Sequence, residues 1–251
     1  MIDHLSFCSV FIEFFLTEES ESPLAIGTGF TIKANDKNEW FLVTNWHCVT
    51  GRHPDTNTPL SKNGLSDPEI AKVHFHSPLG VGNWVEKTIN LLDKEGTPSW
   101  VEHDRGSEID VVIIPIEQSD DIKLYNLSEA INGNDLLTQP SDDVSIIGFP
   151  NGLTGSGKFP IWKTGNIATD FYLDWNDKPL FLIDATTRKG MSGSPVIMIK
   201  EGLCRFERNN LISGRFGKLM GVYSGRIDDS TEIGRVWKPI TLIEIMNKFY
   251  R

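Results

Sequence analysis

The stretch ATTRKGMSGSPVIM, residues 185–198, holds the most informative local pattern of the chain. A serine that attacks a carbonyl needs a turn with few side chains, so that an acyl group can approach it. It also needs backbone N–H groups that converge on the carbonyl oxygen as that oxygen becomes negative. In this stretch Ser192 is the candidate nucleophile, Gly190 and Ser192 are the candidates for the N–H groups, and Gly193 keeps the far side open. An ordinary Gly-Ser turn between two strands fits the same residues, so the motif needs support from elsewhere.

Two further motifs carry the residue types that would activate such a serine. His47 ends the hydrophobic run FLVTNWH, residues 41–47, and histidine is the side chain suited to general-base catalysis near neutral pH. Asp110 opens the apolar run DVVII, residues 110–114, which predicts a partly buried carboxylate in need of a partner. That partner is either a backbone N–H at the start of the strand or the Nδ1–H of His47. On each motif alone, a purely structural role stays open.

The order and spacing of the three motifs strengthen the catalytic interpretation. His47 and Asp110 lie 63 residues apart (110 − 47), and Asp110 and Ser192 lie 82 apart (192 − 110). These lengths suit a His and an Asp from one barrel and a Ser from a second. In this the chain resembles the chymotrypsin-like serine peptidases, especially the bacterial trypsin-like branch that includes the high-temperature-requirement proteases. The resemblance spans roughly residues 5–235, and its other motifs are Gly27-Thr28-Gly29-Phe30, Thr44-Asn45-Trp46-His47, Gly148-Phe149-Pro150, Asp184-Ala185 and Gly221-Val222-Tyr223-Ser224.

The resemblance implies an all-β fold of two six-stranded antiparallel β-barrels followed by a C-terminal helix. It implies a serine endopeptidase, a hydrolase that cleaves peptide bonds through an acyl-enzyme intermediate. The implied catalytic triad is His47, Asp110 and Ser192, and the implied oxyanion hole is made by Gly190 and Ser192. The expected partner is a protein or peptide substrate, and no cofactor or metal is expected.

The residues expected to bind substrate follow from the same resemblance. The family places the base of the primary pocket six residues before the serine, which is Thr186 here, with Thr187 beside it. Cleavage after Lys or Arg needs a buried Asp at that position, so trypsin-like specificity is not expected. Ser224, Gly225 and Arg226 should line the pocket wall and bind the substrate backbone as an added strand. Arg226 either favours an acidic substrate side chain or points to solvent.

The chain departs from the family pattern at the residue before the serine. Secreted members often carry an Asp there, which pairs with a newly cleaved N-terminal amine, whereas this chain has Met191. Activation by N-terminal cleavage is therefore not expected. Ser194 replaces the second Gly of the usual Gly-x-Ser-Gly-Gly, and no PDZ-like domain is expected after the barrels.

Composition restricts the other possibilities. The chain has 251 residues and a formal net charge of −10, which argues against a nucleic-acid partner. No apolar run reaches the length of a membrane span, and the strongly hydrophobic segment 6–16 predicts a buried strand rather than a signal peptide. Three widely spaced cysteines (Cys8, Cys48 and Cys204) form neither a disulfide framework nor a zinc motif. The cytoplasm is the expected location.

The pattern of short β-type runs predicts the organisation of the chain. Domain boundaries are expected at 1–122 for the barrel with His and Asp, 123–139 for a linker, 140–235 for the barrel with Ser, and 236–251 for the helix. Helical periodicity is expected only at residues 124–131 and 239–250. Strands are predicted at 10–15, 29–33, 40–44, 72–76, 111–116, 144–147, 180–183, 195–199 and 219–223.

The sequence leaves other interpretations to compare with a serine endopeptidase. The chain could be a pseudoprotease that keeps the fold as a binding module, or an enzyme that stays latent until an activating partner protein orders its oxyanion loop. The segment 152–158 (GLTGSGK) matches the start of a phosphate-binding loop but continues as Phe159-Pro160, which predicts a surface turn. His74 and His76 alternate on one strand face and could seed a metal site, but without an evident third ligand a solvated strand face is expected.

Overall fold

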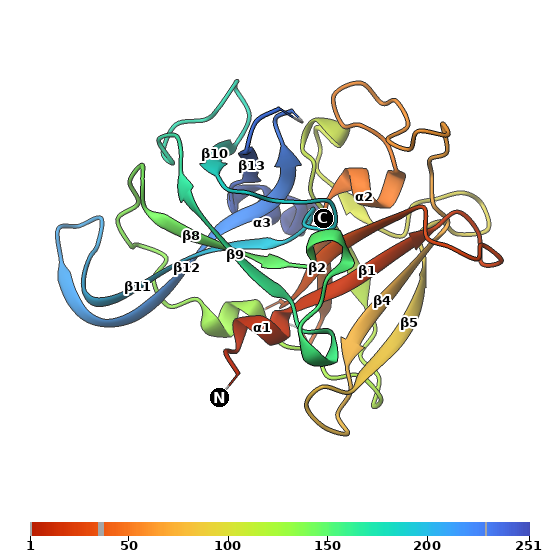
Figure 1. Ribbon diagram of the computed structural model, residues 1–251, viewed down its shortest axis with the longest axis horizontal. Coiled ribbons are helices and arrows are strands. Elements are labelled where there is room, and N and C mark those ends of the chain that lie inside the picture. Colours follow the sequence, from red (N-terminus) through yellow and green to blue (C-terminus); the bar gives the residue numbers. More distant parts are fainter. Residues whose placement is uncertain (1, 35–37, 229) are drawn as a thin grey trace.

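The computed structural model describes residues 2–34, 38–228 and 230–251, and its strands form two curled antiparallel sheets side by side (Figure 1). The first sheet has seven strands in the order β5-β4-β1-β2-β3-β7-β6. Their bounds are β1 (Ser9–Phe15), β2 (Ala25–Lys33), β3 (Trp40–Thr44), β4 (Ile70–His76), β5 (Trp84–Asn90), β6 (Val101–Glu102) and β7 (Val112–Ile116).

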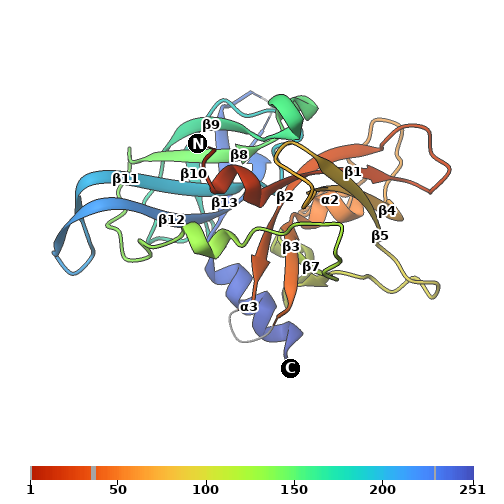
Figure 2. The same cartoon turned by 90° about the horizontal axis from the view of Figure 1, so that it is seen from below.

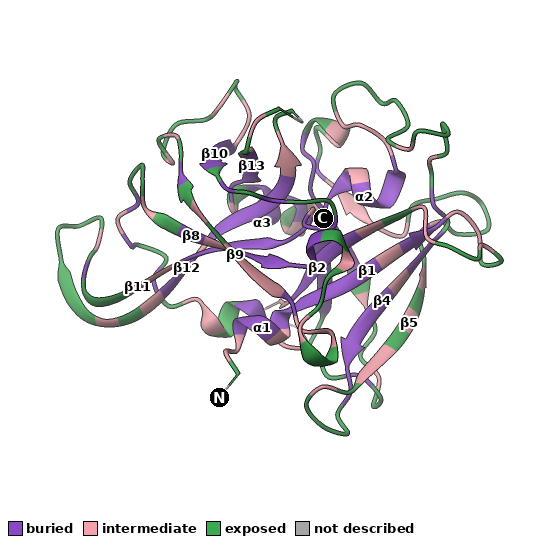
Figure 3. Ribbon diagram, in the orientation of Figure 1, coloured by how far each residue is buried: buried purple, intermediate pink, exposed green. Residues whose placement is uncertain are grey.

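The second sheet is a closed barrel in the order β10-β13-β12-β11-β8-β9. Its strands are β8 (Asp143–Gly148), β9 (Ile161–Ile167), β10 (Leu180–Asp184), β11 (Pro195–Arg205), β12 (Leu211–Arg226) and β13 (Ile233–Trp237). The β11–β12 hairpin is the longest pairing of the molecule and extends beyond the barrel, where its tip is exposed (Figure 3).

Helices are short, apart from the last. They are α1 (Leu5–Cys8), α2 (Trp46–Thr50) and α3 (Ile240–Phe249), with 3₁₀ turns η1 (Gly106–Glu108), η2 (Leu127–Ala130), η3 (Pro150–Gly152) and η4 (Ser156–Lys158). Although α3 follows the second barrel in sequence, it returns to pack against the first sheet (Figure 2). The ring of Phe249 lies 5.1 Å from that of Phe41 on β3, and Glu244 accepts a hydrogen bond from the His103 ring at 2.9 Å.

The prediction of a mainly β molecule with two curled sheets and a C-terminal helix is confirmed, and every predicted strand exists. The first sheet has seven strands rather than six. Sequence analysis missed β5, β6, β9 and β13. The physical reason for two of them is clear. On β5 the inner face is only half-buried, and Lys87 lies between the apolar residues Val85 and Ile89, so the alternation is weak, whereas β6 has only two residues. The helix expected at 124–131 is only the single turn η2.

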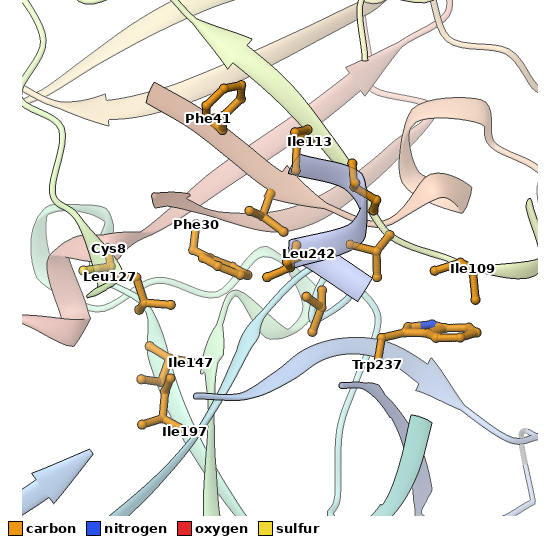
Figure 4. Packing of buried hydrophobic residues seen from close by; sticks show 14 of the residues in the cluster. Cys8, Phe30, Phe41, Ile109, Ile113, Leu127, Ile147, Ile197, Trp237 and Leu242 are labelled. Carbon is orange, nitrogen blue, oxygen red and sulfur yellow. The ribbon is translucent and has the colours of Figure 1, made fainter. Parts of the chain in front are cut away.

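Hydrophobic residues form three clusters with distinct places. One fills the first sheet and another fills the second barrel. The third lies between them and contains residues of both sheets and of α3, including Phe30, Ile113, Ile147, Trp237 and Leu242 (Figure 4). Because apolar burial is the main force for association of the two sheets, this third cluster sets how their facing residues meet.

The three cysteines are free and buried, one in each cluster: Cys8 between the sheets, Cys48 in the first sheet and Cys204 in the barrel. Among the described residues, no helix combines the length and hydropathy that a bilayer crossing requires.

Candidate active site

His47 and Asp110 form a tight pair in the first sheet. The Nδ1 atom of His47 lies 2.7 Å from Oδ2 of Asp110, and the His47 backbone N–H donates to the other carboxylate oxygen at 2.8 Å. The Asp110 side chain is 1% exposed and the His47 side chain 15%. Of the two partners that the sequence left open for Asp110, the structure therefore has both, and both belong to His47.

The local fold explains how these residues come together. β3 ends at Thr44, and the chain then turns into α2, so that His47 is the second residue of a short helix closed by Gly51 at φ 65°. Asp110 lies just before β7, the neighbour of β3 in the sheet. The Asn45 side chain donates to the Asp110 carbonyl oxygen at 2.6 Å and ties the two segments together. Asn45 was noted in the sequence only as part of a motif, without this role.

The environment of the His47 ring sets its protonation. Burial opposes the charged form, but the Asp110 carboxylate offsets it through its charge and its hydrogen bond. The net result is that the pKa of His47 is raised well above its ordinary value of 6.5. The pair therefore favours a protonated imidazole, which is the state that a general base reaches after it accepts a proton.

Ser192 lies in a turn between β10 and β11 that requires glycine on both sides. Gly190 has φ 88° and Gly193 has φ 85°, values that side-chain-bearing residues rarely adopt. A Cβ on Gly190 would overlap the carbonyl oxygen of Phe149, and one on Gly193 would overlap that of Thr28. Both glycines are thus needed for the close approach of the turn to its neighbours.

Thr28 on β2 holds this turn against the first sheet. Its N–H donates to the Ser192 carbonyl at 2.8 Å, and its hydroxyl donates to the Gly190 carbonyl at 2.7 Å. Its own carbonyl accepts from the Thr44 hydroxyl at 2.9 Å. Sequence analysis recorded Thr28 only within a family motif. Its role as the link between the sheets depends on tertiary contacts that no local pattern contains.

Two N–H groups of the turn are left without a protein acceptor. The Lys189 carbonyl accepts from Asn151 N–H at 2.6 Å, and the Met191 carbonyl accepts from Ser194 N–H at 3.0 Å. Both peptides are trans, so the Gly190 and Ser192 N–H groups on their other sides point away from these bonds. Within the described part of the chain neither N–H has an acceptor. These are the two groups that the sequence indicated for the oxyanion hole.

The structure places Ser192 beside the His47 segment. A Cβ on Gly27 would lie 3.4 Å from Cys48 Sγ and 3.6 Å from the Ser192 carbonyl oxygen, so the residue after His47 and the serine flank the same glycine. The described contacts include no hydrogen bond between His47 Nε2 and the Ser192 hydroxyl. Such bonds are often long in enzymes without substrate.

Two residues of the same chemical type as triad members lie near them in the sequence, Ser194 near Ser192 and Asp104 near Asp110. Ser194 is fully buried behind Gly148, where a Cβ would overlap its hydroxyl oxygen. Asp104 faces the end of α3, with Lys248 at 3.5 Å and Arg251 at 3.4 Å. Neither is placed to replace Ser192 or Asp110.

The expected substrate-binding residues lie on two segments next to the turn. After β10, burial alternates strictly from Ile183 to Thr187, so Thr186 is exposed and Thr187 is buried on the opposite side. The two side chains therefore lie on opposite sides of the segment, and Thr186, which the sequence placed at the base of the pocket, lies on the exposed side. On the other segment Ser224 is buried, and the Arg226 guanidinium lies 3.9 Å from the Glu232 carboxylate. Arg226 thus has an acidic neighbour within the chain.

The expectation that His74 and His76 lie on a solvated strand face is wrong. They are 5% and 3% exposed, because Phe11 stacks on the His74 ring and Phe7, Trp84 and Phe159 pack on the His76 ring. Burial lowers the pKa of His76 to about 4.

Glu13 and Glu86, from the neighbouring strands, bring carboxylate oxygens to within 4.8 Å of the His74 ring, so a group with the donor types of a metal site exists after all. Two cations already lie at this group: the Lys158 ammonium is 2.9 Å from His74 Nδ1, and the Lys72 ammonium is 3.6 Å from the Glu86 carboxylate. The segment 152–158 runs from the last residue of η3 to the end of η4 and contacts the first sheet through Lys158. It is a surface turn, as expected, and the helix of a phosphate-binding loop does not follow Lys158.

Comparison with known proteins identifies one family and one fold. The family model described as a trypsin-like peptidase domain matches residues 27–204. A search of curated protein sequences finds no match. Among solved structures, an inactive mutant form of Rv3671c from M. tuberculosis H37Rv is 16% identical with a TM-score of 0.53, covering 97% of this chain and 87% of that one.

The active form of the Rv3671c protease is 15% identical with a TM-score of 0.51, covering 97% of this chain and 81% of that one. The serine endoprotease from Yersinia pestis is 16% identical with a TM-score of 0.51, covering 99% of this chain and 66% of that one. At these identities the structures support the fold, while the family match covers well over half of the chain. On that match, the chain belongs to the trypsin-like peptidase family.

Proposed function

We propose that this trypsin-like peptidase is a serine endopeptidase that uses Ser192, His47 and Asp110 as a catalytic triad. The observation that carries the proposal is the double hydrogen bond between His47 and Asp110, next to a turn that presents Ser192 with two unengaged N–H groups. Nucleophile, base and orienting carboxylate come from separate segments, and no purely structural role requires all three together.

In the first half of the reaction, the Ser192 hydroxyl oxygen attacks the scissile carbonyl carbon while His47 Nε2 accepts the hydroxyl proton. The carbonyl oxygen becomes an oxyanion, which the Gly190 and Ser192 N–H groups stabilise. Asp110 holds the His47 ring and stabilises its cationic form. When the C–N bond breaks, His47 returns the proton to the leaving amine and an acyl-enzyme ester remains on Ser192.

In the second half, water attacks the ester carbonyl and His47 takes a proton from it. A second oxyanion forms and collapses, the ester bond breaks, and His47 returns the proton to the Ser192 oxygen. The products are a carboxylic acid and an amine, and the enzyme is regenerated without a cofactor.

The substrate backbone has a place to bind along the end of β12. The ladder between β12 and β11 ends at Val222, and pairing with β13 is irregular between Tyr223 and Arg226. In the described ladders Ser224 and Gly225 therefore have no Cα partner, which leaves room for an added strand. A protein or peptide in extended conformation is the substrate class that fits.

The direct test is labelling with a fluorophosphonate, which requires an activated serine and not merely the fold. Ser192→Ala should abolish labelling and lower kcat on the order of a million-fold, since removal of the nucleophile disables the whole triad. Ser194→Ala and the exposed Ser213→Ala are matched controls that should keep both. Labelling on Ser194 would show that the nucleophile is wrongly assigned.

Failure of the purified wild-type chain to label would favour the other class, a pseudoprotease or a partner-activated module. Arg188 and Lys189 are exposed just before the turn and are the contact points that we propose for such a partner. We further propose a reducing location such as the cytoplasm, supported by the placement of the three cysteines in three different clusters.

A further inference from the structure

Tyr223 occupies the space next to the proposed nucleophile. Its backbone lies beside the turn, because its carbonyl accepts from Gly193 N–H and its N–H donates to the Ser194 carbonyl, both at 2.9 Å. Its hydroxyl is hydrogen-bonded to the Thr187 hydroxyl on the opposite segment. The side chain therefore crosses from β12 to the 185–187 segment, the two walls between which a substrate side chain would enter.

The ring is fixed in this position. Tyr223 and Thr187 are each 1% exposed, and Tyr223 is the largest fully buried side chain of the described residues. On β13, a Cβ at Gly234 would lie 2.6 Å from the ring carbon Cε2, so Gly234 is the residue that gives the ring its room. Any rotation of the ring out of this space would leave two buried hydroxyls without partners, which is unfavourable.

The walls around the ring are small and uncharged. The buried residues of the 185–187 segment are Ala185 and Thr187, and the Thr187 hydroxyl is already used by Tyr223. On the other wall, Ser224 is buried and Gly225 has no side chain. The charged groups that act on the Tyr223 hydroxyl are Arg226, Arg235 and Glu232. The two arginines have acidic neighbours within the chain, since Arg226 lies 3.9 Å from Glu232 and Arg235 lies 3.6 Å from Asp55. A large or charged substrate side chain would therefore meet the Tyr223 ring, and the charges near it are already paired.

We propose that Tyr223 fills the inner end of the primary specificity pocket, which receives the side chain on the acyl side of the scissile bond. The pocket then admits only small uncharged side chains, namely those of Gly, Ala and Ser. This inference rests on the proposed function, because it uses the position of Ser192 to identify the pocket. It makes Tyr223 a specificity-determining residue without a part in proton transfer.

The first experiment compares peptide substrates that differ only at that residue: Ala, Ser, Leu, Phe or Lys. Wild-type kcat/KM should favour Ala over Phe by about 100-fold, the scale on which a pocket rejects a group that does not fit. Tyr223→Ala should shift the Ala-to-Phe ratio by a similar factor towards Phe. Tyr223→Phe keeps the ring and should keep the preference.

The matched control is Phe216→Ala, which also removes an aromatic ring from β12 but does so where it packs on Phe206 at 5.1 Å. It should leave the ratio unchanged, which separates loosening of the barrel from opening of the pocket. Wild-type cleavage after Phe or Lys as fast as after Ala would overturn the proposal. That comparison needs no variant, so it decides the matter even if Tyr223→Ala does not fold.

A second measurement needs no catalysis. Calorimetry with p-cresol, which has the shape of the tyrosine side chain, compares two variants. It should detect binding to the chain that carries both Ser192→Ala and Tyr223→Ala, and no binding to the Ser192→Ala chain that keeps Tyr223. A folded Tyr223→Ala chain that does not bind p-cresol would show that the space is closed to solvent and would overturn the inference. Absence of fluorophosphonate labelling, by contrast, would contradict the proposed function while p-cresol binding still supports the pocket.

Discussion

The two sheets contribute to the site in different ways. The first sheet supplies side chains, since His47 and Asp110 are joined by hydrogen bonds that their own functional groups make. The second barrel supplies backbone, since the Ser192 turn depends on two glycines with positive φ and on carbonyls that are engaged elsewhere. Proton transfer thus depends on the identity of side chains in the first sheet, whereas the presentation of the backbone N–H groups depends on chain geometry in the second barrel. The two regions should therefore respond differently to substitution.

The largest effect is expected where the side-chain region is broken. Asp110→Asn keeps the shape but turns the His47 ring into the wrong tautomer, so kcat should fall by about 10⁴-fold. Steady-state kinetics with a peptide substrate, together with a thermal melt to verify folding, measures this. Near-normal turnover would mean that another group orients the imidazole.

A smaller loss is expected where the backbone region is disturbed. Gly190→Ala has a strained φ of 88° and a clash with the Phe149 carbonyl, which would displace one N–H of the oxyanion hole. The expected loss of kcat is about 10²- to 10³-fold, the usual cost of one donor. Gly202→Ala is the matched control, because its φ is 92° but no atom lies within 4 Å of its Cβ position. Equal losses in the two variants would indicate general destabilisation instead.

The pH dependence tests the charge of the side-chain region. Because the pKa of His47 is raised above 6.5 and the base acts when neutral, kcat/KM should rise with pH, about tenfold per unit below that pKa. The midpoint should lie above pH 6.5. A midpoint at or below 6.5 would contradict the strong Asp110 contact.

The same raised pKa affects stability with the opposite sign. The protonated His47–Asp110 pair stabilises the fold fully below the unfolded-state pKa, and that contribution is lost as pH rises through the folded-state value. Denaturant titrations of wild type and Asp110→Asn at several pH values would show this as a difference between the two that shrinks with rising pH.

The smallest effect is expected from the N-terminus. Met191, next to Ser192, is fully buried among apolar residues of the barrel and has no charge to hold a new amine. A chain trimmed to begin at Leu5 keeps the buried Leu5 side chain and should turn over within about twofold of the full-length protein. Of the described residues removed, Ile2 is exposed and Asp3 and His4 are half-buried, and a surface ion pair such as that of Asp3 with Arg215 contributes little. Strong activation on trimming would show that the Ser192 turn in the second barrel depends on an ion pair between the new N-terminal amine and a charged side chain.

Local patterns predicted much of this molecule. Apolar runs bounded by turn residues identified nine of the strands, since burial of one or both faces leaves a readable pattern. The strand β5 could not be found in this way, because its inner face is only half-buried and places Lys87 between the apolar residues Val85 and Ile89. Metal-type donors around His74 were missed for a related reason: Glu13 and Glu86 are neighbours of His74 only through strand pairing, far apart along the chain.

The sequence by itself determined the chemical types at the site: a histidine, an aspartate, and a serine between glycines that only a tight turn requires. It also determined that no charge stands beside the serine. Only the tertiary structure decided that Thr28 links the two sheets, that Thr187 is buried and Thr186 exposed, and that Tyr223 lies across the space between the walls. The physical reason is that residue type and local conformation are encoded over a few neighbours. Contacts between the sheets depend instead on how the shared hydrophobic cluster packs, and that packing is a property of the whole chain.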